Sequence, residues 1–412
     1  MIESCSERPL ANGNRLAFLA GAAVLLLGAS ACVEDIKDEG GSIPAEQGPI
    51  PPPPGEVVGP PAPPPQSTMP PNVGTVPSTS PGDGGMPPAA ATGLLADPLS
   101  QPPMDLKDVG LYTALPDITK THPKAFYYEP RHALWSNGLA KHRYAVLPDG
   151  QKVDTSVRDG WDFPVGTLFF KTFTYQKDGQ EIPVETRLIR RSKTEGEPQE
   201  QWEFFVWGWN PEGTAASLLE IRLTNPRQIT MNGMEITHTI PKRGDCWNCH
   251  IANKSPIIGF DELRLNSTLA GENESQLDQV IAKEWLTAAP PKPWLEITDS
   301  NPMQKQVLEY VHGNCAHCHN GLPALEPGAR YDALDLRWDK VLEQTVNKMT
   351  MTVGTADGVR IVPGNAMESI LFLAMEQGGV NAEVKLMPPV GVDLVDMQAI
   401  DLLRQWINGM AE

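Results

Sequence analysis

CWNCH at residues 246–250 and CAHCH at residues 315–319 hold four of the six cysteines in this chain. In each string two thiols lie three positions apart, so one helical turn brings them to the same side of the backbone. A histidine follows the second thiol directly in both strings. The other two cysteines, Cys5 and Cys32, lie near the N-terminus, so the folded part has none left for a disulfide framework.

Both strings match the attachment pattern of haem c. Two thiols at this spacing can form thioethers to the two vinyl groups of one porphyrin, and the histidine that follows can ligate its iron. The thiols are those of Cys246 and Cys249 in the first string and of Cys315 and Cys318 in the second. The sequence therefore predicts two covalently bound haem c groups, with His250 and His319 as iron ligands. The alternative is zinc, because paired C-x-x-C strings also suit a tetrahedral zinc site.

The first 31 residues are typical of an export signal. Arg8 and Arg15 precede an apolar run at residues 16–27, which is too short to span a membrane. The run ends in small residues before Cys32 and resembles a bacterial lipobox, which predicts lipid attachment to the Cys32 thiol and an outer-membrane lipoprotein that faces the periplasm. The alternative is an ordinary signal peptidase site, which would release a soluble periplasmic protein.

Residues 32–104 are rich in proline, glycine and serine, with runs such as Pro51–Pro54. Such a segment cannot bury enough apolar surface to offset its ordering entropy. We expect it to be a disordered linker that tethers the folded part to its lipid anchor.

The next segment, residues 105–290, is rich in β-branched and aromatic residues. Strands are predicted at residues 161–173, 184–191, 202–209 and 228–240, with a hairpin turn at Asp178-Gly179. We expect an antiparallel sandwich or barrel domain that carries the first haem. We expect its charged strand residues to form a solvated face: Glu185, Arg187, Arg190 and Arg191.

The last segment, residues 291–412, has helical periodicity. Apolar residues from Met303 to Val311 recur at helical spacing and lead into Cys315, and Asp393 can cap a final helix at residues 397–407. With the loop at residues 386–391, this order resembles a class I cytochrome c domain. That resemblance implies an all-α domain in which Met387 is the sixth iron ligand opposite His319. A thioether ligand favours reduced iron and raises its potential. One departure is that no glycine lies between Met303 and Tyr310, where such domains have a close helix crossing.

Over most of its length the chain resembles a little-studied family of bacterial di-haem c-type cytochromes. The matching stretches are residues 134–150, 161–175, 185–188, 207–219 and 314–319, together with Pro363-Gly364 and Met387-Pro388-Pro389. The resemblance implies an electron carrier on the periplasmic side of a membrane, without naming a substrate. The overall fold class expected is α+β, with the β-rich domain followed by the helical one.

The sixth ligand of the first haem is not fixed by the motif. Met231, Met234 and His238 lie just upstream of Cys246 and are the first candidates. His122, His132 and His142 lie earlier and could fold back. His312 and His317 are expected at exposed helical positions.

A net charge of −18 argues against a nucleic-acid partner, because a phosphate backbone attracts a basic surface. An acidic surface suits transient docking to basic periplasmic redox proteins. The leading interpretation is an electron carrier that relays single electrons between such partners. The alternatives are a di-haem oxidoreductase, for example a peroxidase with an open site at the first haem, and an interaction protein whose β-rich domain docks a partner.

Overall fold

One antiparallel sheet forms the centre of the N-terminal half, and each of its six strands pairs with the next one in sequence. The strands are β1 (Phe126–Tyr127), β2 (Ala140–Val146), β3 (Leu168–Lys177), β4 (Gln180–Arg191), β5 (Trp202–Trp209) and β6 (Ala216–Leu218). The computed structural model describes residues 90–158, 160–220, 225–231, 233–241, 243–250, 255–321, 334–350, 358–376, 384, 386–389 and 391–411. Because β1 and β6 are its outer strands, the sheet is open and these strands do not close into a barrel.

The β3–β4 hairpin is the longest pairing in the sheet and confirms the turn predicted from Asp178-Gly179. Both turn residues have positive φ angles, 52° and 76°, which is the geometry that Asp-Gly adopts in a two-residue hairpin loop. The register sets Lys171 opposite Arg187 and Phe173 opposite Glu185. Charged side chains of neighbouring strands therefore lie on one face together.

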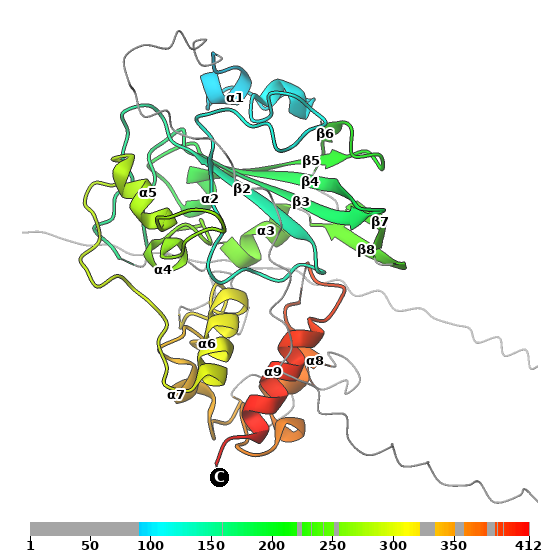
Figure 1. Ribbon diagram of the computed structural model, residues 1–412, viewed down its shortest axis with the longest axis vertical. Coiled ribbons are helices and arrows are strands. Elements are labelled where there is room, and N and C mark those ends of the chain that lie inside the picture. The colour runs from blue at the N-terminus through cyan, green and yellow to red at the C-terminus, as the bar shows by residue number, and fades with distance from the viewer. Residues whose placement is uncertain are drawn as a thin grey trace, which may run out of the picture. The chain divides into compact units, whose positions relative to one another are not determined.

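Both faces of the sheet are covered (Figure 1). On one face, α1 (Gly93–Ala96) and the 3-10 helix η1 (Leu106–Val109) pack with Trp207 and other sheet residues. On the other face, α4 (Glu262–Leu265) and α5 (Gln276–Ala282) pack around a cluster of aromatic rings. Those rings are Phe126, Tyr128, Trp161, Phe163, Phe169, Trp202 and Phe260. The aromatic residues thus form sheet core, as expected from their density in the sequence.

Residues 90–104 belong to this folded part, which corrects the predicted extent of the linker. Leu94 and Leu95 of α1 are buried against the sheet, and the Trp207 indole donates to the Pro103 carbonyl at 3.0 Å. The apolar pair at residues 94–95 offers enough buried surface to order this stretch. The signal peptide, Cys32 and most of the predicted linker lie outside the described residues.

A second sheet contains only two strands, β7 (Asn225–Met231) and β8 (Met234–Ile240). Ile229 and Ile236 anchor it to Phe173 of the larger sheet. Helix α3 (Arg243–His250) begins shortly after β8 and carries the first motif. The short helix α2 (Pro198–Gln201) leads into β5.

The C-terminal residues form helices joined by irregular segments. They are α6 (Pro302–Asn314), α7 (Val341–Thr345), the 3-10 helix η2 (Ala366–Glu368), α8 (Ile370–Glu376) and α9 (Met397–Asn408). Isolated bridges such as Val346–Ile361 lie between them. The described structure is therefore α+β, and its C-terminal part contains few helices.

Helices α6 and α9 pack against each other through Val307, Leu308 and Val311 on one side and Ile400, Leu403 and Trp406 on the other. The cap of α9 is Asp396, whose Oδ1 accepts from the Ala399 amide at 3.2 Å. This corrects the expectation that Asp393 caps the helix.

Asp393 instead belongs to a joint between the two halves of the described chain. Its amide and that of Leu394 donate to Asn137 Oδ1 at 2.7 and 3.0 Å. On the other side of the joint, the Trp135 amide donates to Asn314 Oδ1 at 2.7 Å. The segment between β1 and β2 is thus fixed to both α6 and the residues before α9.

Candidate functional site

The first motif lies on α3, directly beside the face of the large sheet. Cys246 is buried with Phe204, Val206 and Ile240. The Trp247 ring packs edge-on against Phe204, with centroids 4.6 Å apart. These contacts fix the helix so that the residues of the motif face one cavity.

One hydrogen bond and its burial determine the tautomer and the charge of His250. Its Nδ1 lies 2.5 Å from the Pro256 carbonyl oxygen, so we assign the ring hydrogen to Nδ1, which donates to that carbonyl. Burial lowers the pKa of His250 to about 4, which keeps the imidazole neutral at pH 7. The lone pair is then on Nε2, and a backbone carbonyl orients the ring as is usual for histidines that bind metals.

The first cavity has a volume of about 140 Å³ and lies between the sheet, α3 and the loop that follows β1. Cys246, Cys249 and His250 line it. So do three further histidines, His132, His238 and His317.

The second motif follows α6 without a break. The Cys315 amide still donates to the Val311 carbonyl at 2.8 Å, and the amides of Cys318 and His319 both donate to the Cys315 carbonyl. A tight turn therefore holds the second motif at the end of the helix. Burial raises the pKa of the Cys315 thiol to about 12, which keeps it protonated.

The second cavity has a volume of about 270 Å³ and is lined mostly by aliphatic side chains. Cys315, Cys318 and His319 line it, and so does Met387. The Met387 amide donates to the Ala374 carbonyl at 2.9 Å, so α8 holds the loop that carries this methionine. The structure thus brings the predicted ligand pair, His319 and Met387, to one apolar cavity.

His238 is the one residue of its predicted group that lines the first cavity. Met234 is 57% exposed, and Met231 packs beside Ile229 in the core under the small sheet. His238 is buried, and its Nε2 lies 2.7 Å from Glu185 Oε1. Its Nδ1 has no hydrogen-bond partner among the described residues.

Glu185 orients His238 and is held in turn by an arginine. Its carboxylate accepts from Arg187 Nε at 2.8 Å and from Arg187 Nη2 at 2.6 Å. Burial alone would raise the pKa of Glu185, but Arg187 and His238 outweigh it and lower the pKa to about 2. The expectation of a solvated face was wrong for Glu185, Arg190 and Arg191, which are buried. His238 of the small sheet contacts Glu185, and the Arg190 guanidinium donates to the carbonyls of Pro98 and Ser100.

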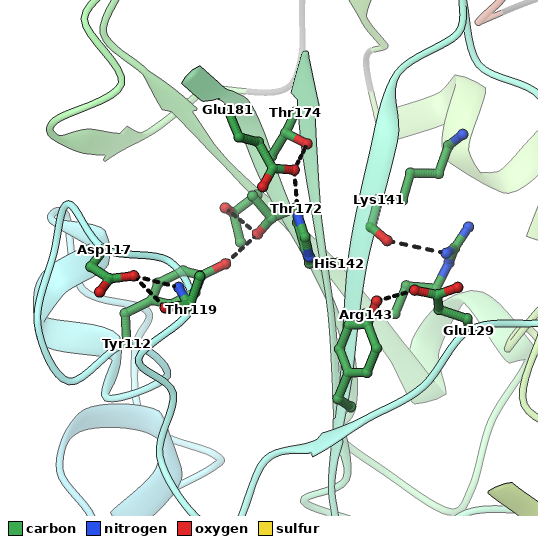
Figure 2. A network of polar contacts seen from close by, with 12 residues as sticks. Tyr112, Asp117, Thr119, Glu129, Lys141, His142, Arg143, Thr172, Thr174 and Glu181 are labelled. Atoms are coloured by element: carbon green, nitrogen blue, oxygen red, sulfur yellow. Dashed lines mark hydrogen bonds and ion pairs between the residues drawn. The ribbon is translucent and has the colours of Figure 1, made fainter. Parts of the chain in front are cut away.

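The earlier histidines divide into two groups. Figure 2 shows His142 directed toward Glu181, with Nε2 2.6 Å from Oε1, among the residues around Thr172 and Thr174. His142 and His122 do not line the first cavity, whereas His132 does. The residues expected to be exposed, His312 and His317, are 8% and 4% exposed, so that prediction was wrong. The loop after β1 covers this end of α6, and His312 meets His132 edge-on there.

Two cations in the wall of the first cavity were not singled out from the sequence. Arg143 is buried and lines this cavity. Lys171 lines it too, and burial together with the nearby charges of Arg187 and Arg143 lowers the pKa of Lys171 to about 7. No carboxylate of the described residues lies within ion-pair distance of Lys171 or Arg143. The alternation of strand residues could have predicted this position for Lys171, because it lies between Phe169 and Phe173 on the inward-facing side of the strand.

Comparison of this chain with models of protein families, with curated proteins and with solved structures finds no match. Within the described part of the chain, every helix is too short or too polar to span a membrane. The predicted signal peptide and lipid attachment at Cys32 fall outside that part.

The donors around each cavity fit haem c. Each cavity has two thiols at the required spacing and a histidine next to them, and the second also has a soft thioether. The described part of the chain also brings Cys249, His317 and Cys318 together, which alone would give three ligands for a soft metal.

Proposed function

We propose that this protein is a di-haem c-type cytochrome that transfers single electrons between periplasmic redox partners. The observation that carries the proposal is that each C-x-x-C-H string opens onto its own cavity and contributes its histidine to the lining. Haem c would supply reversible one-electron chemistry at iron in both cavities. The thioethers would come from Cys246 and Cys249 at the first site and from Cys315 and Cys318 at the second.

At the first site two histidines, His250 and His238, line the cavity and have a ring nitrogen available for iron. His250 presents Nε2 because Pro256 engages its Nδ1, and His238 presents Nδ1 because Glu185 engages its Nε2. A carboxylate behind a ligating histidine fixes its tautomer and raises its basicity. We therefore assign His238 as the sixth ligand of the first iron.

At the second site the ligands are His319 and Met387. The lining is apolar, which excludes water from the iron and favours the reduced state over the charged oxidised state. A histidine–methionine pair raises the potential relative to two histidines. The second site should therefore have the higher potential, and electrons should collect there. Helices α6 and α9 with the loop around Met387 would then form a cytochrome c-like helical domain.

The cations of the first cavity suit the two carboxylates that haem carries as propionates. Lys171, Arg187 and Arg143 line this cavity, and Arg187 forms an ion pair with the buried Glu185. Binding of a propionate would give Lys171 and Arg143 the ionic partners that buried cations require.

The same cations, Lys171, Arg143 and Arg187, support a second function, that of an oxidoreductase. If His238 does not bind the first iron, Lys171, Arg143 and His132 would surround an open coordination site suited to peroxide or a small anion. The protein would then be a di-haem oxidoreductase in which the second site feeds electrons to the first.

Electron paramagnetic resonance of the oxidised, matured protein separates these functions. The carrier predicts low-spin ferric iron at both sites, and His238→Leu should convert the first site to high spin without loss of haem. Met234→Leu is the matched control, because the same small sheet carries this exposed methionine. A high-spin signal in the unmodified protein that changes on addition of peroxide would favour the oxidoreductase.

The proposal also includes where the protein acts and what it meets. It rests here on the predicted export signal, the lipid anchor at Cys32 and the acidic net charge. The export signal and anchor would hold the protein on the periplasmic side of a membrane, where the linker and the acidic charge would help it reach basic redox partners.

A further inference from the structure

The second thiols of the two motifs meet, although they lie far apart in the sequence. Cys249, Cys318 and His317 each offer a ligand atom, and these atoms all lie within 4.8 Å of one another. The Cys249 and Cys318 thiols form a hydrogen bond, which lowers the pKa of Cys249 and raises that of Cys318. The two candidate sites therefore adjoin at this point.

A thin wall separates the two cavities. Trp135, His317, Pro388 and Val392 line both of them. Trp135 is fixed on two sides, because its indole Nε1 donates to the Leu394 carbonyl at 2.8 Å and its amide donates to Asn314. Single side chains thus belong to both sites, and hydrogen bonds hold the wall in place.

We propose that the two haem groups approach each other edge to edge at Cys249 and Cys318, and that electrons pass directly between them there. The inference rests on the proposed function. Each thioether sulfur is joined through one carbon to the edge of its porphyrin, so two neighbouring sulfurs bring two ring edges together. We name this contact of Cys249, Cys318 and His317 the junction.

The exchange at the junction is a balanced one-electron step. Ferrous iron at one site becomes ferric, ferric iron at the other becomes ferrous, and the step needs no bond breaking, proton or further reactant. External redox partners supply the electron at one site and remove it at the other. Two single-haem carriers on one chain would need no such contact.

The competing occupant of the junction is a soft metal in a chain without haem. Cys249, Cys318 and His317 supply three ligands of the kind that zinc accepts, but structural zinc takes four. The test must therefore measure haem and zinc in the same sample.

The experiment is electron paramagnetic resonance of the matured protein at increasing degrees of reduction, with haem counted by the pyridine haemochrome assay and zinc by elemental analysis of the same sample. At the junction two ferric irons should interact magnetically, so the oxidised spectrum should not equal the sum of two isolated signals. Reduction of the site with the higher potential should restore the spectrum of one isolated ferric centre. The variant Cys318→Ser should lose more of the interaction than Cys315→Ser, because both remove one thioether from the same haem but only Cys318 lies at the junction.

Two haems whose spectra simply add at every degree of reduction would overturn the junction and leave the proposed function standing. A chain with zinc and no haem would overturn both.

Discussion

Replacing Glu185 by Gln isolates the charge that supports the first site. Glutamine keeps the shape and one acceptor oxygen but removes the negative charge. Glu185 is fully buried, and Arg187, which donates two hydrogen bonds to it, is 23% exposed. The substitution therefore leaves a largely buried guanidinium without its counter-charge.

The magnitude follows from the burial of this pair. Removing one partner of a buried ion pair costs about 3–5 kcal/mol, and the partial exposure of Arg187 favours the lower end, about 3 kcal/mol. That loss corresponds to a fall in Tm of roughly 6–12 °C for a domain of this size. The reduction potential of the first iron should rise, because His238 loses the carboxylate that makes it a better ligand for oxidised iron.

The assay is thermal unfolding followed by circular dichroism, with a redox titration of the same sample. The matched control is Glu203→Gln on β5, because Glu203 pairs with Arg190 of the same sheet but is 41% exposed. Arg190 also keeps its bonds to the Pro98 and Ser100 carbonyls, so the control should lose less stability than Glu185→Gln. Equal losses in the two variants, or an unchanged potential in Glu185→Gln, would refute the reasoning.

Three further variants test other parts of the structure. Met387→Leu should keep the haem attached through its thioethers but convert the second iron to high spin and lower its potential; an unchanged optical and paramagnetic spectrum would exclude Met387 as a ligand. Burial lowers the pKa of His312 and lowers that of His132 to about 3, so the unfolded chain takes up these protons first and stability falls as pH drops below about 6.5. His132 contributes about 2 kcal/mol to the loss of folding free energy between pH 7 and 5. His312→Phe should make the free energy of unfolding, measured in urea at both pH values, depend less on pH. Gly313→Ala should lose about 1–3 kcal/mol in urea unfolding, because its Cβ would lie 2.9 Å from a backbone oxygen of the loop after β1, whereas Gly244→Ala meets no atom within 4 Å and should be near neutral.

Local features of the fold could be predicted because short-range chemistry determines them. Asp178-Gly179 requires left-handed backbone at two positions, and the hairpin forms there. The apolar spacing from Met303 to Val311 gives α6, with Asn301 as its cap. The cap of α9 was predicted wrongly: Asp396, and not Asp393, accepts the hydrogen bond from the Ala399 amide.

Features that depend on long-range packing were missed. Glu185 and Arg187 look like a polar strand face in sequence, but His238 of the small sheet contacts the buried Glu185, and Arg187 is only 23% exposed. His317 looks like an exposed position within its motif, yet the meeting of the two motifs buries it against Cys249. Gly313 was not singled out from the sequence, yet a Cβ there would lie 2.9 Å from the His132 carbonyl oxygen in the loop after β1.

Counting haem on the mature chain tests the central claim most directly. The protein should be expressed with its own export signal and a haem-maturation system, purified, and analysed by the pyridine haemochrome assay and by intact mass spectrometry under denaturing conditions. We expect two covalently bound haems per chain, one on each C-x-x-C-H string. A correctly exported chain whose mass shows no covalent haem, and which carries zinc when native, would contradict it.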